Sequence, residues 1–167
     1  MRLPVSLLLI LFIAQLCSCN LVTRPQALRM NNALVHINDS LYDKGREYGA
    51  LLGEAMKSKD YSRLAPCRVQ FEKFIDLSRE RVMHMQDVGG SEELRHCEAD
   101  LLVIEKRLVS QDFSGFEHLN AESGMGEIAG LYDVVKADSK EEETLLNKFR
   151  IIQEAYARKN GFRLSAR

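Results

Sequence analysis

The sequence predicts an all-α protein, an up-and-down antiparallel four-helix bundle. Its composition is rich in helix-forming residues, with no Trp and only three Pro among 167 residues. Apolar residues recur at spacings of three and four along most of the chain, which is the pattern of amphipathic helices. Short breaks rich in Gly, Ser and Pro divide this pattern into four segments. Short loops leave neighbouring helices antiparallel, so four apolar faces can close one core.

The first eighteen residues predict an export signal. An apolar run covers residues 5–16, follows the basic Arg2, and is shorter than the about 20 residues that a transmembrane helix needs. Leu16, Ser18 and Cys19 match the end of a bacterial lipoprotein signal, in which Cys19 would be acylated and become the first residue. The predicted organisation is a lipoprotein-type signal peptide at 1–18, a lipid anchor and short tether at 19–25, and a helical bundle domain at 26–167.

An alternative stays open, because Cys17 is an unusual residue two positions before the acylated cysteine. Ordinary cleavage near Cys19 or Asn20 would release a soluble secreted or periplasmic protein. The lipoprotein interpretation instead predicts an exported protein anchored in the cell envelope, at the outer membrane or the cell surface. Loss of residues 1–18 leaves 22 basic and 24 acidic residues, a formal charge of −2, so no nucleic-acid partner is expected.

The first two helices are expected before and after a break at residues 60–62. The first runs from Pro25 to about Ser58, with one continuous stripe of apolar or small residues. Pro66 suits the first turn of the second helix, where its missing N–H costs nothing. Gly89 and Gly90 are expected to end that helix, because glycine adopts the left-handed conformation cheaply.

The third helix is expected to begin after Ser91, a favourable N-cap, and to fade near Asn120. The last helix is expected from about Glu127 to Asn160, with Gly161 as its cap. Asp138 and Glu142 fall on its apolar stripe, which predicts that its middle is kinked or partly solvated. Ser139 and Glu142 also match a capping box, so a break there is the alternative. We favour one continuous helix, because the apolar residues before and after Ser139 fall on the same side of it.

Four segments of the chain resemble a family of poorly characterised bacterial surface lipoproteins. The resemblance spans most of the chain beyond the signal and implies a helical, exported, membrane-anchored protein, with no catalytic residues to carry over. The segments are Ile37-Asn38-Asp39-Ser40-Leu41-Tyr42, Glu72-Lys73-Phe74-Ile75-Asp76, Asp87-Val88-Gly89-Gly90-Ser91-Glu92-Glu93-Leu94 and Glu154-Ala155-Tyr156-Ala157-Arg158-Lys159-Asn160-Gly161-Phe162.

Cys67 and Cys97 are not expected to form a disulfide. If the second and third helices form a hairpin about Gly89, Cys97 lies level with residues 80–82, about 14 residues from Cys67. At 1.5 Å per residue this offset is roughly 20 Å, far beyond the reach of a disulfide. Both cysteines are expected to act as small hydrophobic residues.

The same hairpin brings His84 level with His96, with Glu93 and Cys97 on the adjoining turn. Imidazole, carboxylate and thiolate groups can bind a borderline metal. These residues do not share one evident face, however, and they match no recognised metal-binding spacing. We therefore predict neither a metal site nor a cofactor, and keep the four residues as weak candidates.

No catalytic motif is evident, so the sequence predicts a protein that is not an enzyme. We expect a non-catalytic lipoprotein, held to the membrane through a lipid at Cys19, that binds an envelope or host protein or a small ligand. The alternative is a metal-handling or enzymatic bundle that uses His84, His96 and Cys97.

Overall fold

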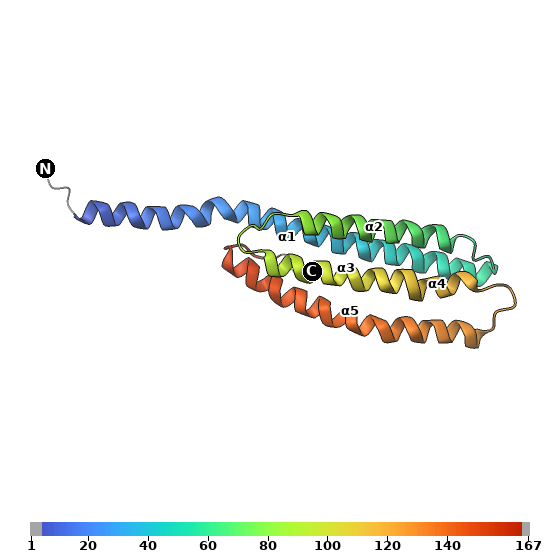
Figure 1. Ribbon diagram of the computed structural model, residues 1–167. Helices are drawn as coiled ribbons and strands as arrows, with labels where there is room; N and C mark the ends of the chain where they lie inside the picture. Colours follow the sequence, from blue (N-terminus) through green and yellow to red (C-terminus); the bar gives the residue numbers. More distant parts are fainter. Residues whose placement is uncertain (1–4, 165–167) are drawn as a thin grey trace.

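The structure, a computed structural model, describes the backbone of residues 5–164 and the side chains of residues 24–164. The all-α prediction is confirmed, because the described residues form four long helices and no strand (Figure 1). The bounds are α1 Val5–Ser58, α2 Leu64–His84, α3 Glu92–Arg107, a π-helical segment η1 Leu108–Asp112, a single turn α4 Phe113–Gly115, a 3-10 turn η2 Phe116–His118, and α5 Met125–Lys159.

Helix α3 is the most enclosed of the four helices. It packs closely against both α2 and α5, whereas α1 packs mainly against α2 and touches α5 least among the neighbouring pairs. The core falls into two clusters. The first contains Leu34, Ile75, Leu94, Leu102 and Phe149 among others, and the second contains Tyr48, Leu64, Phe116 and Ile128 among others.

Helix α1 differs from the prediction at its start. It runs through Pro25, which lies inside the helix and does not open it. Its buried stripe agrees with the predicted one, and includes Leu34, Leu41, Tyr48 and Leu52. Figure 1 shows the amino-terminal part of α1 extending past the ends of the other helices.

The third predicted helix is interrupted, which the periodicity does not predict. α3 ends at Arg107, and the following five residues take the wider π-helical turn. The change leaves the carbonyl of Phe113 facing α1, where it accepts a hydrogen bond of 2.7 Å from the hydroxyl of Tyr48. The rings of the same two residues stack at 4.7 Å between centroids. Burial raises the pKa of the Tyr48 hydroxyl, which therefore stays protonated and can donate this bond.

Helix α5 is one continuous helix, so the alternative break near Ser139 is wrong. The expected solvation of its middle is confirmed. Between Ile128 and Phe149 no side chain of α5 is fully buried, and Asp138 and Glu142 are half-buried. Gly161 follows the helix with a φ of 71°, as predicted for a left-handed cap, and its N–H donates to the carbonyl of Arg158.

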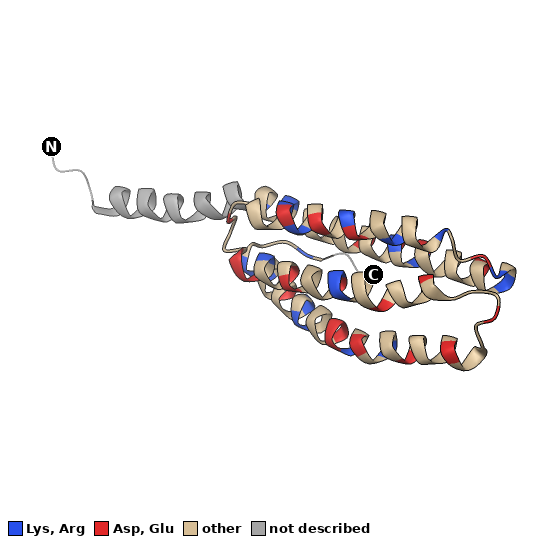
Figure 2. Ribbon diagram, turned by 45° about the vertical axis from the view of Figure 1, so that its right-hand side comes forward, with Lys and Arg blue, Asp and Glu red and all other residues tan. Residues whose placement is uncertain are grey.

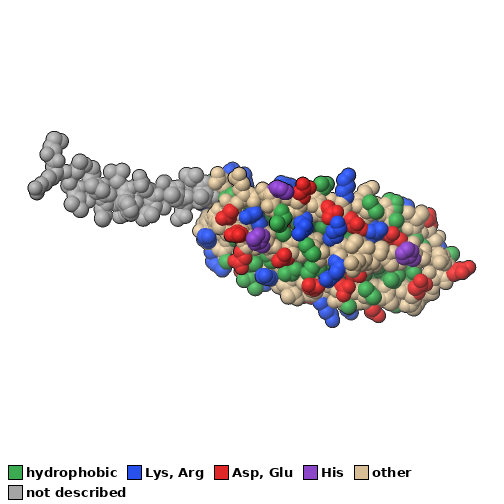
Figure 3. Space-filling view, in the orientation of Figure 1, with side chains coloured by type: hydrophobic (Ala, Val, Ile, Leu, Met, Phe, Trp, Pro, Cys, Tyr) green, Lys and Arg blue, Asp and Glu red, His purple; other side chains and the backbone are tan. Residues whose placement is uncertain are grey.

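The cysteines agree with the prediction, because Cys67 and Cys97 are both free. Cys97 is buried, and its thiol lies 4.0 Å from the carbonyl oxygen of Leu145 on α5. Burial raises the pKa of both thiols, which keeps them in the unreactive neutral form. On the molecular surface, charged side chains of both signs are scattered among hydrophobic ones over the face that Figure 3 shows.

Candidate functional site

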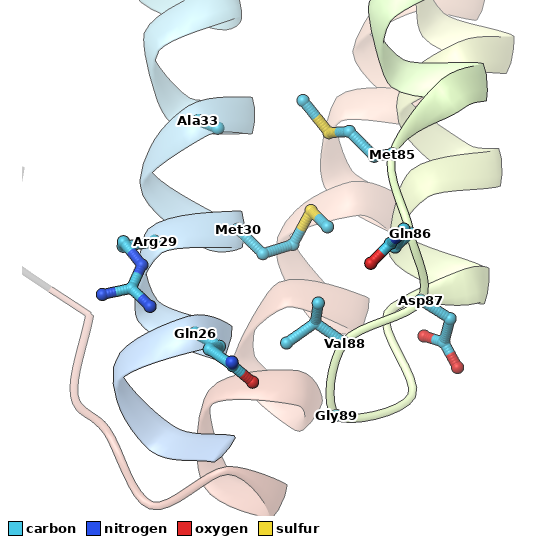
Figure 4. A pocket seen from close by; sticks show the side chains of 9 residues that line it. All are labelled: Gln26, Arg29, Met30, Ala33, Met85, Gln86, Asp87, Val88 and Gly89. Atoms are coloured by element: carbon cyan, nitrogen blue, oxygen red, sulfur yellow. The ribbon is translucent and has the colours of Figure 1, made fainter. Parts of the chain in front are cut away.

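A pocket of about 470 Å³ lies between residues 26–33 of α1 and the loop that joins α2 to α3 (Figure 4). Met30, Met85 and Val88 point into this space, while Arg29 and Asp87 point away from it. Gln26, Ala33, Gln86 and Gly89 complete the lining. Its interior is therefore mainly apolar, with amide groups at the edge.

The loop wall of the pocket is held by hydrogen bonds from α3 and α5. The Tyr156 hydroxyl donates to the Val88 carbonyl at 2.8 Å, and the Asn160 amide donates to the Gly89 carbonyl at 3.2 Å. The Arg95 guanidinium donates to the Met85 carbonyl at 2.6 Å. Three backbone carbonyls of the loop are thus fixed by side chains, so the pocket wall is organised before any ligand binds.

Glycine is required at the tip of this loop. Gly89 and Gly90 have φ values of 63° and 75°, but they do not end α2 as predicted, because α2 ends at His84 with the extended Met85 as its C-cap. A Cβ on Gly89 would also collide with the side chain of Asn160. Ser91 differs from its predicted role, because its hydroxyl does not cap α3. Instead the hydroxyl accepts a bond from the N–H of Val88 and so closes the loop on itself.

The four weak metal candidates are not brought together. His84, Glu93 and His96 are exposed, whereas Cys97 is buried against α5. One ring nitrogen of His84 contacts the backbone carbonyl of Glu80 on its own helix. Across the described residues, no group of three or more His, Cys, Asp or Glu side chains could hold a metal ion. The residues of the alternative metal-handling or enzymatic function therefore do not form a site in the described structure.

A layer of carboxyl groups lies along α3 and η1, where these segments face α1 and α5, and of its members the sequence indicated only those of α5. Glu98 of α3 is completely buried, and one of its oxygens accepts a hydrogen bond of 3.1 Å from the Asn38 amide of α1. Its other oxygen has no partner, nor has the amide oxygen of Asn38. Burial raises the pKa of Glu98 to about 7, although the bond from Asn38 opposes that change.

Two carboxyl pairs continue this layer between α3 and α5. Glu105 faces Glu142, and burial together with this neighbour raises the pKa of Glu105 to about 8. Asp112 of η1 faces Asp138, and burial followed by the charge of Asp138 raises the pKa of Asp112. Two carboxyl groups that face each other oppose each other's ionisation.

The spacing of these residues is a signal that the sequence carries. Glu98 and Glu105 are seven residues apart, so they occupy one side of α3, and Asp112 follows seven residues later at the end of the π-helical segment. Asp138 and Glu142 were recognised on the stripe of α5, but their partners across the interface were not. Charged residues are seldom buried, and so the three carboxyl groups were not expected to face the interior.

The anchoring residue predicted from the sequence is Cys19, and its side chain lies outside the described side chains, like that of Cys17. Within the helices that the structure describes, none has an apolar stretch long enough to cross a membrane. The pocket residue Gln26 follows Cys19 by seven residues, or about two turns of α1.

Comparison of the chain with models of known protein families, with curated proteins and with solved structures finds no match. The resemblance to bacterial surface lipoproteins therefore stays a prediction from four segments of sequence.

Proposed function

We propose that this protein is a non-catalytic lipoprotein of the bacterial cell envelope that acts by binding a protein or a small ligand. A lipid at Cys19 would anchor it, at the outer membrane or the cell surface. The observation that carries the proposal is the apolar run followed by Leu16-Cys17-Ser18-Cys19 at the head of a helical domain. The pocket between α1 and the loop from α2 to α3 gives such a domain a place to bind.

The lining of the pocket indicates what it can accept. Its thioether and valine side chains form an adaptable apolar surface, because methionine has several rotatable bonds and a polarisable sulfur. The volume of about 470 Å³ is within the range of small-molecule sites. It also suits one or two apolar side chains of a protein partner. Because the wall is fixed by Tyr156, Asn160 and Arg95, binding there would cost little ordering of the loop.

The anchor can be tested by metabolic labelling with a fatty-acid analogue. We expect the wild-type protein and Cys17→Ser to carry the label, because residue 17 leaves with the signal, and Cys19→Ser to carry none. Label that persists in Cys19→Ser, or is missing from the wild type, would show that Cys19 is not the anchor.

The pocket can be tested with a photo-reactive amino acid in place of Ala33, one of its lining residues. A matched control carries the same group in place of Lys57, which is exposed at the far end of α1. Irradiation of intact cells is expected to give a discrete adduct from position 33 and none from position 57. Equal adducts from both positions, or none from position 33, would remove the pocket from the proposal.

A further inference from the structure

The pocket between α1 and the loop from α2 to α3 has an apolar floor that continues into the hydrophobic core. Met30 is only 9% exposed and belongs to the larger core cluster. Met85 and Val88 are half-buried and pack against the same cluster. All three side chains point into the pocket (Figure 4). A ligand that covers this floor therefore removes apolar surface from water.

The mouth of the pocket carries hydrogen-bond donors and a positive charge. The side chains of Gln26, Arg29 and Gln86 line it, and all three are exposed. The guanidinium of Arg29 forms no ion pair with a carboxylate of the residues that the structure describes. Because Arg29 precedes Met30 directly on α1, its flexible side chain can pair with a group at the mouth while the rest of a ligand lies on the floor.

The negative charge of the lining is already used by the loop. The carboxylate of Asp87 accepts hydrogen bonds from the N–H of Ser91 at 2.5 Å and from the Ser91 hydroxyl at 3.1 Å. It also points away from the pocket (Figure 4). A carboxylate that is bonded within its own loop is a poor partner for a cationic ligand.

A second positive charge lies behind the pocket wall. The guanidinium of Arg95 donates to the Met85 carbonyl at 2.6 Å, and within the described part of the chain it forms no ion pair. These charges act locally, because Figure 2 shows basic and acidic residues interspersed along the described helices. The pocket therefore combines an apolar floor with a mouth that favours an anion.

We propose that this pocket binds a fatty acid, a ligand with one alkyl chain and a carboxylate headgroup. The chain would lie on Met30, Met85 and Val88, whose flexible thioethers adapt to its shape. The carboxylate would pair with Arg29, because a guanidinium matches a carboxylate with two parallel hydrogen bonds. This ligand class rests on the pocket of the function proposed above and narrows what that pocket binds.

Other amphiphilic ligands suit the pocket less well. A cationic headgroup would meet the charges of Arg29 and Arg95, while Asp87 is held by Ser91. A neutral alcohol would cover the floor equally but gain no ion pair at the mouth. The volume of about 470 Å³ is in the lower part of the range of small-molecule sites, which favours a single chain over a lipid with two.

The test compares three ligands of one chain length by isothermal titration calorimetry of the purified protein near neutral pH, below the concentrations at which they form micelles. Decanoate is expected to bind at least about fivefold more tightly than decanol. Decyltrimethylammonium is expected to bind more weakly than decanol. Octanoate, which is two methylenes shorter, is expected to bind about tenfold more weakly than decanoate, because each buried methylene contributes about fourfold.

Two variants separate the headgroup from the chain. Arg29→Gln is expected to weaken decanoate about fivefold and to leave decanol unchanged. Its matched control is Arg46→Gln, an exposed arginine further along α1. Met85→Gln is expected to weaken decanoate and decanol alike, by about tenfold, because an amide replaces the thioether on the floor. Its matched control is Met83→Gln, which is 50% exposed and outside the lining. Melting curves verify that all variants are folded.

Three results would overturn this ligand class. They are equal binding of decanoate and decanol, unchanged decanoate binding by Arg29→Gln, and unchanged binding of both ligands by Met85→Gln. The photo-reactive group at position 33 separates this outcome from failure of the proposed function. A protein adduct there without fatty-acid binding would keep the pocket and assign it to a protein partner. The absence of both would remove the pocket as well.

Discussion

Raising the pH from about 5.5 to about 8.5 is expected to lower the free energy of unfolding of this protein by several kcal/mol. The cause is the carboxyl layer between α3 and its neighbours. Burial raises the pKa of Glu98 to about 7 and, together with Glu142, that of Glu105 to about 8, against 4.5 for an ordinary glutamate. The folded protein therefore binds more protons than the unfolded chain between these values.

The direction of the effect follows from this proton difference. A carboxyl group whose pKa is raised by folding contributes its full stability below its unfolded pKa of 4.5, and loses it as the pH rises through the folded value. The part of the Glu98 shift that lies above pH 5.5 corresponds to about 2 kcal/mol, at about 1.4 kcal/mol per pH unit. The pair of Glu105 and Glu142 adds a loss of the same order, and the raised pKa of Asp112 acts in the same direction.

Groups facing this layer modify the effect without reversing it. Asn38 of α1 stabilises the charged form of Glu98 through its hydrogen bond, and Arg107 does the same for Asp112 through its charge. From α5, Asp138 and Glu142 oppose ionisation of their partners. Urea unfolding followed by far-ultraviolet circular dichroism, at both pH values, measures the difference.

Two variants isolate the origin of this pH dependence. Glu98→Gln with Glu105→Gln is expected to remove most of it, because glutamine keeps the shape and does not titrate. Glu93→Gln, an exposed position on the same helix, is expected to leave it unchanged. A wild-type stability that is constant across this pH range would contradict the expectation. The expectation would also be contradicted if the Glu98→Gln, Glu105→Gln double variant had the same pH dependence of stability as the wild type.

The sequence predicted the four helices well, because their signals are local. Gly161 follows the end of α5 with the positive φ expected of such a cap, whereas Gly89 and Gly90 have a positive φ but lie in the loop beyond His84, where α2 ends. The stripe of α1 was read correctly because α1 presents one apolar face to the bundle. These features depend on neighbours within one or two turns, which the sequence displays directly.

The carboxyl layer and the π-helical segment were not predicted, because both depend on contacts between distant residues. The wider turn at Leu108–Asp112 places the Phe113 carbonyl against Tyr48, which is 65 positions away in the chain. Glu98 accepts a hydrogen bond from Asn38, 60 positions away. The pocket likewise brings Met30 of α1 beside Val88 of the loop between α2 and α3. A pattern of residues along one helix does not indicate which residues distant in the chain will contact each other.

The buried residues of α3 also exceed those that the sequence pattern indicates. Leu94, Leu101 and Ile104 follow the spacing of one apolar stripe, but Leu102, which lies beside that stripe, is also completely buried. An outer helix buries one stripe, whereas α3 lies between α2 and α5 and buries a wider arc. Which helix occupies this enclosed position depends on how the four helices pack together.

Leu102→Ala is expected to lower the free energy of unfolding by about 2–5 kcal/mol. Leu102 has no exposed surface and belongs to the larger core cluster, so its truncation loses apolar burial and leaves a cavity. The matched control is Val103→Ala, the next residue on α3, which is 50% exposed and should change stability by less than about 0.5 kcal/mol. Urea unfolding at about pH 5.5, where the carboxyl layer stays largely protonated, measures both. Equal losses from the two variants would mean that α3 is not enclosed on both sides as the structure shows.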